Sequence, residues 1–226
     1  MNRKEIRDYI LILADEFDVD EDEGLFDAEN LNVLINISQN KVNMDMARLI
    51  PEKFRKTKLL DITTNKKTYS IVSDLEITDF LRFQKILHNV SGKRATPLLE
   101  IDPEDEWEYE DMEELTYWFQ EDKDNVCFGK TATSTVAERL KAYYISELAG
   151  LTEDSESPSM PAVCHPLISI DVLKQFVLAD EGKWKEIEIY YQQVLLDTVR
   201  GLDVKSDFAY SGQKSSIRRI LTSRDA

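Results

Sequence analysis

Four acids between residues 18 and 29 have the spacing of a calcium-binding loop. They occupy positions 1, 3, 5 and 12 of such a loop: Asp18, Asp20, Asp22 and Glu29. Alternating carboxylates in a tight loop converge on one hard cation, and a terminal glutamate closes its coordination shell. However, position 6, where the chain must turn sharply, holds Glu23 instead of glycine. A solvated acidic connection is therefore the preferred interpretation, and we expect no bound metal and no cofactor.

A thiol and an imidazole are adjacent at Cys164 and His165. A nucleophile and its base need side chains within hydrogen-bond reach and a third group that orients the base, which sequence neighbours rarely provide. Both residues also begin an apolar helical pattern, so we expect them to pack at the start of a helix. The two cysteines and two histidines have no zinc-site spacing, and so few cysteines suit a reducing compartment.

Thirteen acids crowd into residues 100–124, which contain one base, Lys123. Paired carboxylates serve glycoside hydrolysis and two-metal phosphate chemistry, but any segment this acidic offers such pairs by chance. The seven glycines of the chain do not cluster into a phosphate-binding loop. The sequence therefore predicts no catalytic residues, and we expect the protein not to be an enzyme.

The chain carries a formal charge of −16, from 28 bases and 44 acids among 226 residues. This excess argues against binding nucleic acid by neutralising its phosphates and against docking on an anionic membrane. We see no secretory signal and no apolar run of the roughly 20 residues that a membrane-spanning helix needs. Residues 201–226 reverse the sign, with five bases against three acids, which is typical of an interaction tail.

Apolar residues at helical spacing predict helices near both ends of the chain. One helix is expected over 3–17, and a longer one begins at an N-cap, Asp27, and ends at Pro51. Residues 150–161 form a polar linker with two prolines. A helical pair follows, whose apolar stripes run from Val163 to Val177 and from Trp184 to Thr198, and Gly201 closes its second helix.

The middle of the chain changes to a period of two, which predicts strands. Residues 60–62 and 69–71 are expected to pair as a β-hairpin, and residues 80–90 favour a strand. Two short strands are predicted at 116–119 and 125–128, whereas 136–146 suits either a helix or a strand.

These elements predict an α+β protein with a mainly α-helical core. The core comprises residues 1–50 and 161–200, with one long N-terminal helix and the C-terminal helical pair. Residues 51–150 form a small antiparallel β extension that carries the acidic insertion 100–124. Residues 201–226 form an extended, flexible tail.

The order of these elements resembles that of the head–tail connector adaptor proteins of tailed bacteriophages. The segments that carry the resemblance are LFDAENL at 25–31, LDI and KTYSI in the hairpin at 60–71, DFLRFQKI at 79–86, LKAYY at 140–144 and GKWKE at 182–186. The similarity spans about residues 20–200 and is one of pattern and order. The acidic insertion is longer than the shortest members of that family would have.

The resemblance implies a structural protein that forms a ring, usually of twelve copies, beneath the portal of the phage head. Its partners would be the portal protein, a tail or neck (stopper) protein and other copies of itself, with DNA passing through the lumen without specific contact. It would act in the neck of the virion and be made in the host cytoplasm.

The same resemblance implies that the C-terminal segment reaches onto the portal. A short basic and apolar segment that follows about fifteen residues expected to be flexible suits folding on a partner surface. The candidate portal-binding residues are Ile217, Arg218, Arg219, Ile220, Leu221 and Arg224. The alternative function is that of an acidic, soluble protein-binding or regulatory module, including one that mimics DNA with its carboxylates.

Overall fold

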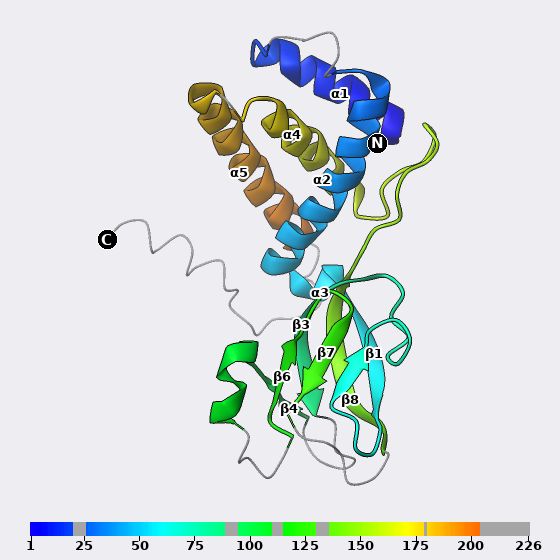
Figure 1. The fold of residues 1–226 in the computed structure, drawn as a ribbon. Helices are drawn as coiled ribbons and strands as arrows, with labels where there is room; N and C mark the ends of the chain where they lie inside the picture. The colour runs from blue at the N-terminus through cyan, green and yellow to red at the C-terminus, as the bar shows by residue number, and fades with distance from the viewer. Residues whose placement is uncertain (20–25, 89–94, 110–114, 130–135, 179, 204–226) are drawn as a thin grey trace, which may run out of the picture. The chain divides into compact units, whose positions relative to one another are not determined.

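The chain forms two compact units in a computed structural model (Figure 1). The structure describes residues 1–19, 26–88, 95–109, 115–129, 136–178 and 180–203. The helical unit comprises Met1–Lys53 and Leu148–Ala226, and the β unit comprises Phe54–Glu147. The fold is therefore α+β, with the β unit inserted into the sequence of the helical one.

The helical unit contains the helices that apolar spacing predicts. They are α1 (Arg3–Glu16), α2 (Ala28–Leu49), α4 (His165–Phe176) and α5 (Glu181–Asp203). The short α3 (Pro51–Phe54) and the 3₁₀ helix η2 (Ala162–Cys164) were not predicted. The side chain of Asp27 accepts a hydrogen bond from the Asn30 backbone at 2.8 Å, so its predicted capping of α2 is confirmed. Asn2 and Glu5 cap α1 reciprocally.

Two details of the predicted C-terminal pair are wrong. Val163 lies in η2 and is 45 % exposed, so it does not belong to the apolar stripe of α4. Gly201 lies inside α5 and does not end it, because the helix continues to Asp203. Leu202 is buried, and its carbonyl accepts a hydrogen bond from Lys53 Nζ at 2.5 Å, which holds this last turn in place.

Apolar side chains from α1, α2, α4 and α5 form the core of the helical unit. The fully buried ones include Ile6, Ile10, Leu13, Ile35, Val42, Met46, Leu167, Ile170, Leu173 and Ile187. They recur at spacings of three and four residues, so each helix presents one apolar stripe.

Charged side chains are also buried among α2, α4 and α5. Asp171 is fully buried and forms an ion pair with Lys41, while Lys174 pairs with Glu188. Burial tends to raise the pKa of Glu188, but hydrogen bonds from Lys174 and Gln192 bring it below its ordinary value. These pairs join α4 to both neighbouring helices.

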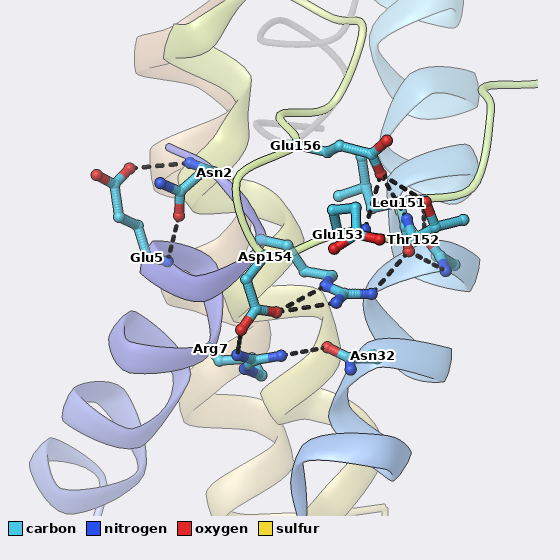
Figure 2. Close-up of polar contacts among 11 residues, drawn as sticks. Asn2, Glu5, Arg7, Asn32, Leu151, Thr152, Glu153, Asp154 and Glu156 are labelled. Carbon is cyan, nitrogen blue, oxygen red and sulfur yellow. Dashed lines mark hydrogen bonds and ion pairs between the residues drawn. The ribbon is translucent and has the colours of Figure 1, made fainter.

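The connection between the β unit and η2 is held against α1 and α2 (Figure 2). Arg3 and Arg7 both donate to the carboxylate of Asp154, with nitrogen–oxygen distances of 2.7–3.1 Å. The two guanidinium groups, Arg7 first, lower the pKa of Asp154 to about 2. Asn36 of α2 accepts from the backbone of Leu151 at 2.8 Å. The linker predicted over 150–161 is thus an ordered loop.

The β unit contains two four-stranded sheets. The first has the order β1-β8-β3-β4, and the second has the order β2-β7-β6-β5. The strands are β1 (Arg55–Ile62), β2 (Thr68–Ser70), β3 (Phe80–His88), β4 (Thr96–Pro97), β5 (Leu99–Glu100), β6 (Tyr117–Gln120), β7 (Asn125–Phe128) and β8 (Val136–Ser146). The predicted strands in β3, β6 and β7 are confirmed, and the ambiguous segment 136–146 is a strand.

The predicted hairpin between 60–62 and 69–71 is wrong. β1 pairs with β8, and β2 pairs with β7 in the other sheet. Leu60, Ile62 and Tyr69 are all buried, as their alternation predicts, but they reach one core from two different sheets. A period of two identifies the buried face of a strand and does not identify its partner.

The two sheets pack face to face over one apolar core. β1, β3 and β8 contribute Leu60, Ile62, Phe83, Ile86, Leu140, Ala142 and Tyr144, and the second sheet contributes Tyr69, Trp118, Val126 and Phe128. On its far face the second sheet carries a smaller cluster of Tyr117, Phe119 and Cys127. The β unit is therefore larger and more layered than the predicted hairpin extension.

Candidate protein-binding surface

The predicted calcium register is only partly within the described residues. Asp18 and Glu29 are exposed, and the backbone carbonyl of Asp18 accepts a hydrogen bond from Lys183. Asp20 and Asp22 lie outside the described residues. Within the described ranges, no three histidine, cysteine, aspartate or glutamate side chains come close enough together to hold a metal ion.

Cys164 and His165 are both buried, at the start of α4 as predicted. Burial raises the pKa of the Cys164 thiol to about 12 and lowers that of the His165 imidazole. The imidazole nitrogens contact other groups: Nδ1 lies 2.8 Å from the Met1 amine and Nε2 lies 3.2 Å from the Met160 carbonyl. This geometry favours packing and orientation of the helix start over nucleophilic chemistry.

The predicted portal-binding residues lie outside the described residues. They are Ile217, Arg218, Arg219, Ile220, Leu221 and Arg224. The acidic insertion, by contrast, is described over residues 100–109 and 115–124.

The first part of the acidic insertion forms a 3₁₀ helix, η1 (Pro103–Glu108), on the far face of the second sheet. Asp102 caps it by accepting from the Glu104 backbone at 3.2 Å. Ile101 and Tyr109, at its two ends, pack on the cluster of Tyr117, Phe119 and Cys127. Apolar residues thus attach both ends of the acidic segment to the sheet.

One acid of this segment faces inward. Glu106 accepts a hydrogen bond from the Tyr117 hydroxyl at 3.3 Å, and its Oε1 lies 2.5 Å from Lys67 Nζ. The hydrogen bond to Glu106 raises the pKa of Lys67. Glu106 therefore fixes η1 to the sheet, which leaves its neighbours facing solvent.

A glycine makes room for the aromatic ring beneath η1. Gly129 directly follows β7, and its N–H donates to the Tyr117 carbonyl at 3.0 Å. A Cβ atom on Gly129 would lie only 2.2 Å from Tyr117 Cε1. The ring can cover the strand end and support η1 because this position has no side chain.

Trp107 projects from this anchored segment and is 72 % exposed. The acids around it are also exposed: Asp102, Glu104, Asp105 and Glu108. An exposed tryptophan held on a fixed backbone, with a polar surround, is typical of a protein-binding surface. We call these four acids and Trp107 the acidic surface.

Sequence reasoning identified the acids of this surface but not its tryptophan. Trp107 and Tyr109 both lie among acids, yet the first is exposed and the second packs on the sheet. The two aromatic residues differ in their positions in η1 and at its end. The start of η1 is visible in the sequence, because Asp102 is an N-cap and is followed by Pro103.

No protein-family model matches the chain, and no curated protein matches it. Among the described helices, none is both long enough and apolar enough to cross a membrane.

Proposed function

We infer that this chain is a structural head–tail connector subunit of a tailed phage. It would form a ring, of twelve copies in the usual case, beneath the portal and join it to the tail, with DNA passing through the lumen. Its place would be the neck of the virion, reached from the host cytoplasm during assembly.

The observation that supports this proposal is the order of the units along the chain. Two helices come first, a complete β unit is inserted after Lys53, and a helical pair follows from Leu148 onward. This helix–β–helix order agrees with the order on which the resemblance to connector adaptors rests, although the hairpin at 60–71 that also carried it is not formed.

Co-expression with the portal protein of the same phage tests the proposal. We expect electron micrographs of the purified complex to show a ring of this protein on the portal. Removing residues 204–226, beyond the last described turn of α5, should abolish binding to the portal while the remaining chain stays folded. A matched control replaces those residues with a glycine and serine linker of equal length.

Unchanged portal binding by the truncated chain would contradict the role given to the tail. No binding by the full chain would contradict the connector function itself. The alternative, an acidic protein-binding module, is favoured by one observation, the exposed Trp107 among fixed acids. In that case the partner would bind through Trp107, and portal protein would not be retained.

A further inference from the structure

The outer face of the first sheet is basic, although the protein as a whole is strongly acidic. In the pairing of the strands, Arg55 of β1 and Arg82 of β3 lie on the two sides of Ile145 of β8. Lys85 of β3 lies beside Tyr143 of β8. In the next row Lys141 of β8 lies between Leu59 and Leu87. We call Arg55, Arg82, Lys85 and Lys141 the basic face.

Among the described residues, no carboxylate pairs with the cations of the basic face. Within the described part of the chain, none of the four forms an ion pair with a carboxylate, whereas most other lysines and arginines there do. β1 and β3 together contain a single acid, Asp61, near the end of β1.

An aromatic ring lies at the centre of the basic face. The Arg55 guanidinium lies 4.5 Å from the centroid of the Tyr143 ring, and the Lys141 ammonium lies 5.3 Å from it. These contacts keep Arg55 and Lys141 near the ring, and neither cation is paired with a described carboxylate.

The basic face and the acidic surface lie on opposite sides of the β unit. The inner face of the first sheet contributes to the core that the two sheets share, so the basic residues point away from it. On the other side of the shared core lies the second sheet, followed by the cluster of Tyr117, Phe119 and Cys127 and then by the acidic surface. Charge therefore changes sign across the layers of a single unit.

We propose that the β units of neighbouring copies bind head to tail, with the basic face of one copy on the acidic surface of the next. Different surfaces then meet at each contact, and such heterologous contacts generate a ring when the rotation closes. This inference rests on the ring assembly proposed above and identifies the surfaces that would make it.

A second copy fits the basic face better than nucleic acid does. The four exposed acids of the acidic surface match the four cations in number, and Trp107 offers an aromatic face to a guanidinium. At about 0.1 M salt the Debye length is about 10 Å, so touching charges attract while the remaining negative charge is largely screened. Duplex DNA would offer the same negative charges without the exposed tryptophan, and the net charge of −16 argues against binding by neutralising phosphates.

Sedimentation velocity of the full chain, at rising protein concentration and about 0.1 M salt, tests the contact. We expect reversible self-association that weakens at about 1 M salt. The variants R82E/K85E and E104K/E108K should each associate about tenfold or more weakly, because attraction becomes repulsion. An equimolar mixture of the two variants should associate again, since each altered surface then meets its opposite charge.

The matched control is K4E/K185E, which makes the same change in net charge on exposed lysines of α1 and α5. It should associate like the wild-type chain, and circular dichroism should show all variants folded. A wild-type chain that stays monomeric at every concentration would overturn the proposal. Equal losses of self-association in R82E/K85E and K4E/K185E would overturn it too. So would a mixture of R82E/K85E and E104K/E108K that does not associate again.

Two further results separate this contact from the connector function. If the chain binds the portal but the charge reversals do not weaken its self-association, the proposed contact alone is refuted. Self-association through these surfaces without portal binding would refute the connector function alone. Binding of duplex DNA that R82E/K85E abolishes, with no self-association, would assign the basic face to nucleic acid and overturn the proposal.

Discussion

Replacing Gly129 with alanine should destabilise the β unit through a single steric conflict. The added Cβ atom would lie 2.2 Å from Tyr117 Cε1, where an ordinary contact begins at 3.4 Å, so the two groups must separate by about 1.2 Å. The backbone of Gly129 is not in the left-handed region, so space alone makes this glycine necessary.

The ring of Tyr117 has little freedom to move. It is 2 % exposed, its centroid lies 5.5 Å from that of Tyr109, and its hydroxyl donates to Glu106. Overpacking of a well-packed site costs about 1–3 kcal/mol. Because the ring is enclosed by the sheet and by η1, we expect G129A to cost about 3 kcal/mol, at the upper end of that range.

Urea unfolding followed by tryptophan fluorescence measures this cost. A W184F background leaves Trp107 and Trp118 as the fluorophores, and both belong to the β unit. The matched control is G201A, because nothing lies within 4 Å of a Cβ atom at Gly201. Because Gly201 lies in α5, this control should leave the unfolding of the β unit unchanged.

A double-mutant cycle decides whether the steric reasoning is correct. In a Y117A background the ring is absent, so G129A should then cost less than about 0.5 kcal/mol. A cost of G129A that is the same with and without the ring would refute the reasoning. A cost below about 0.5 kcal/mol in the wild-type chain would refute it as well.

Three further predictions concern a buried ion pair, a paired surface carboxylate and two buried thiols. K41M should lower the free energy of unfolding of the helical unit, measured in urea, by about 2–3 kcal/mol, because Asp171 stays buried without its cation. The free energy of unfolding of K41M/D171L should lie within about 1 kcal/mol of the wild-type value. Asp154 has a pKa of about 2 in the folded chain, so its ion pairs stabilise the fold fully above about pH 4 and lose this effect towards pH 2. Thermal melts at decreasing pH should therefore show a smaller drop in melting temperature for D154N than for the wild-type chain. Burial raises the pKa of Cys127 to about 11 and of Cys164 to about 12, so mass spectrometry should find both unmodified by iodoacetamide at pH 8 unless urea is added.

The helices were predictable because their limits depend on neighbouring residues. Asp27 caps α2 with its own carboxylate, and Pro51 lacks the N–H that would continue the helix. Gly201 misled the prediction because a glycine that touches nothing costs only about 1 kcal/mol inside a helix, which buried Leu202 offsets.

Strand pairing was not predictable, because it joins residues that are far apart in the sequence. Residues 60–62 pair across to β8, about eighty residues later, and no local signal specifies that partner. The basic face was missed for the same reason. Arg55, Lys85 and Lys141 come from three strands, and irregularities in the pairing of β3 with β8 decide which side chains align.

The candidate site was predictable in composition and not in geometry. Thirteen acids between 100 and 124 identify an unusual surface, but burial separates Glu106, which holds η1, from the exposed Asp105 and Glu108. Trp107 and Tyr117 are both aromatic residues of the acidic insertion, and only packing shows that Trp107 is exposed and that Tyr117 is buried beneath η1.

The insertion of the β unit has a consequence for synthesis of the chain on the ribosome. β1 and β8 pair from end to end, with Arg55 opposite Ile145, so the unit closes on itself without help from the helices. α2 and α4, however, are separated by more than 100 residues. At roughly 5–20 residues per second, the apolar stripe of α2 must wait about 5–20 s for α4 to be made. During that interval α1 and α2 are the part of the nascent protein most exposed to aggregation and most in need of a chaperone.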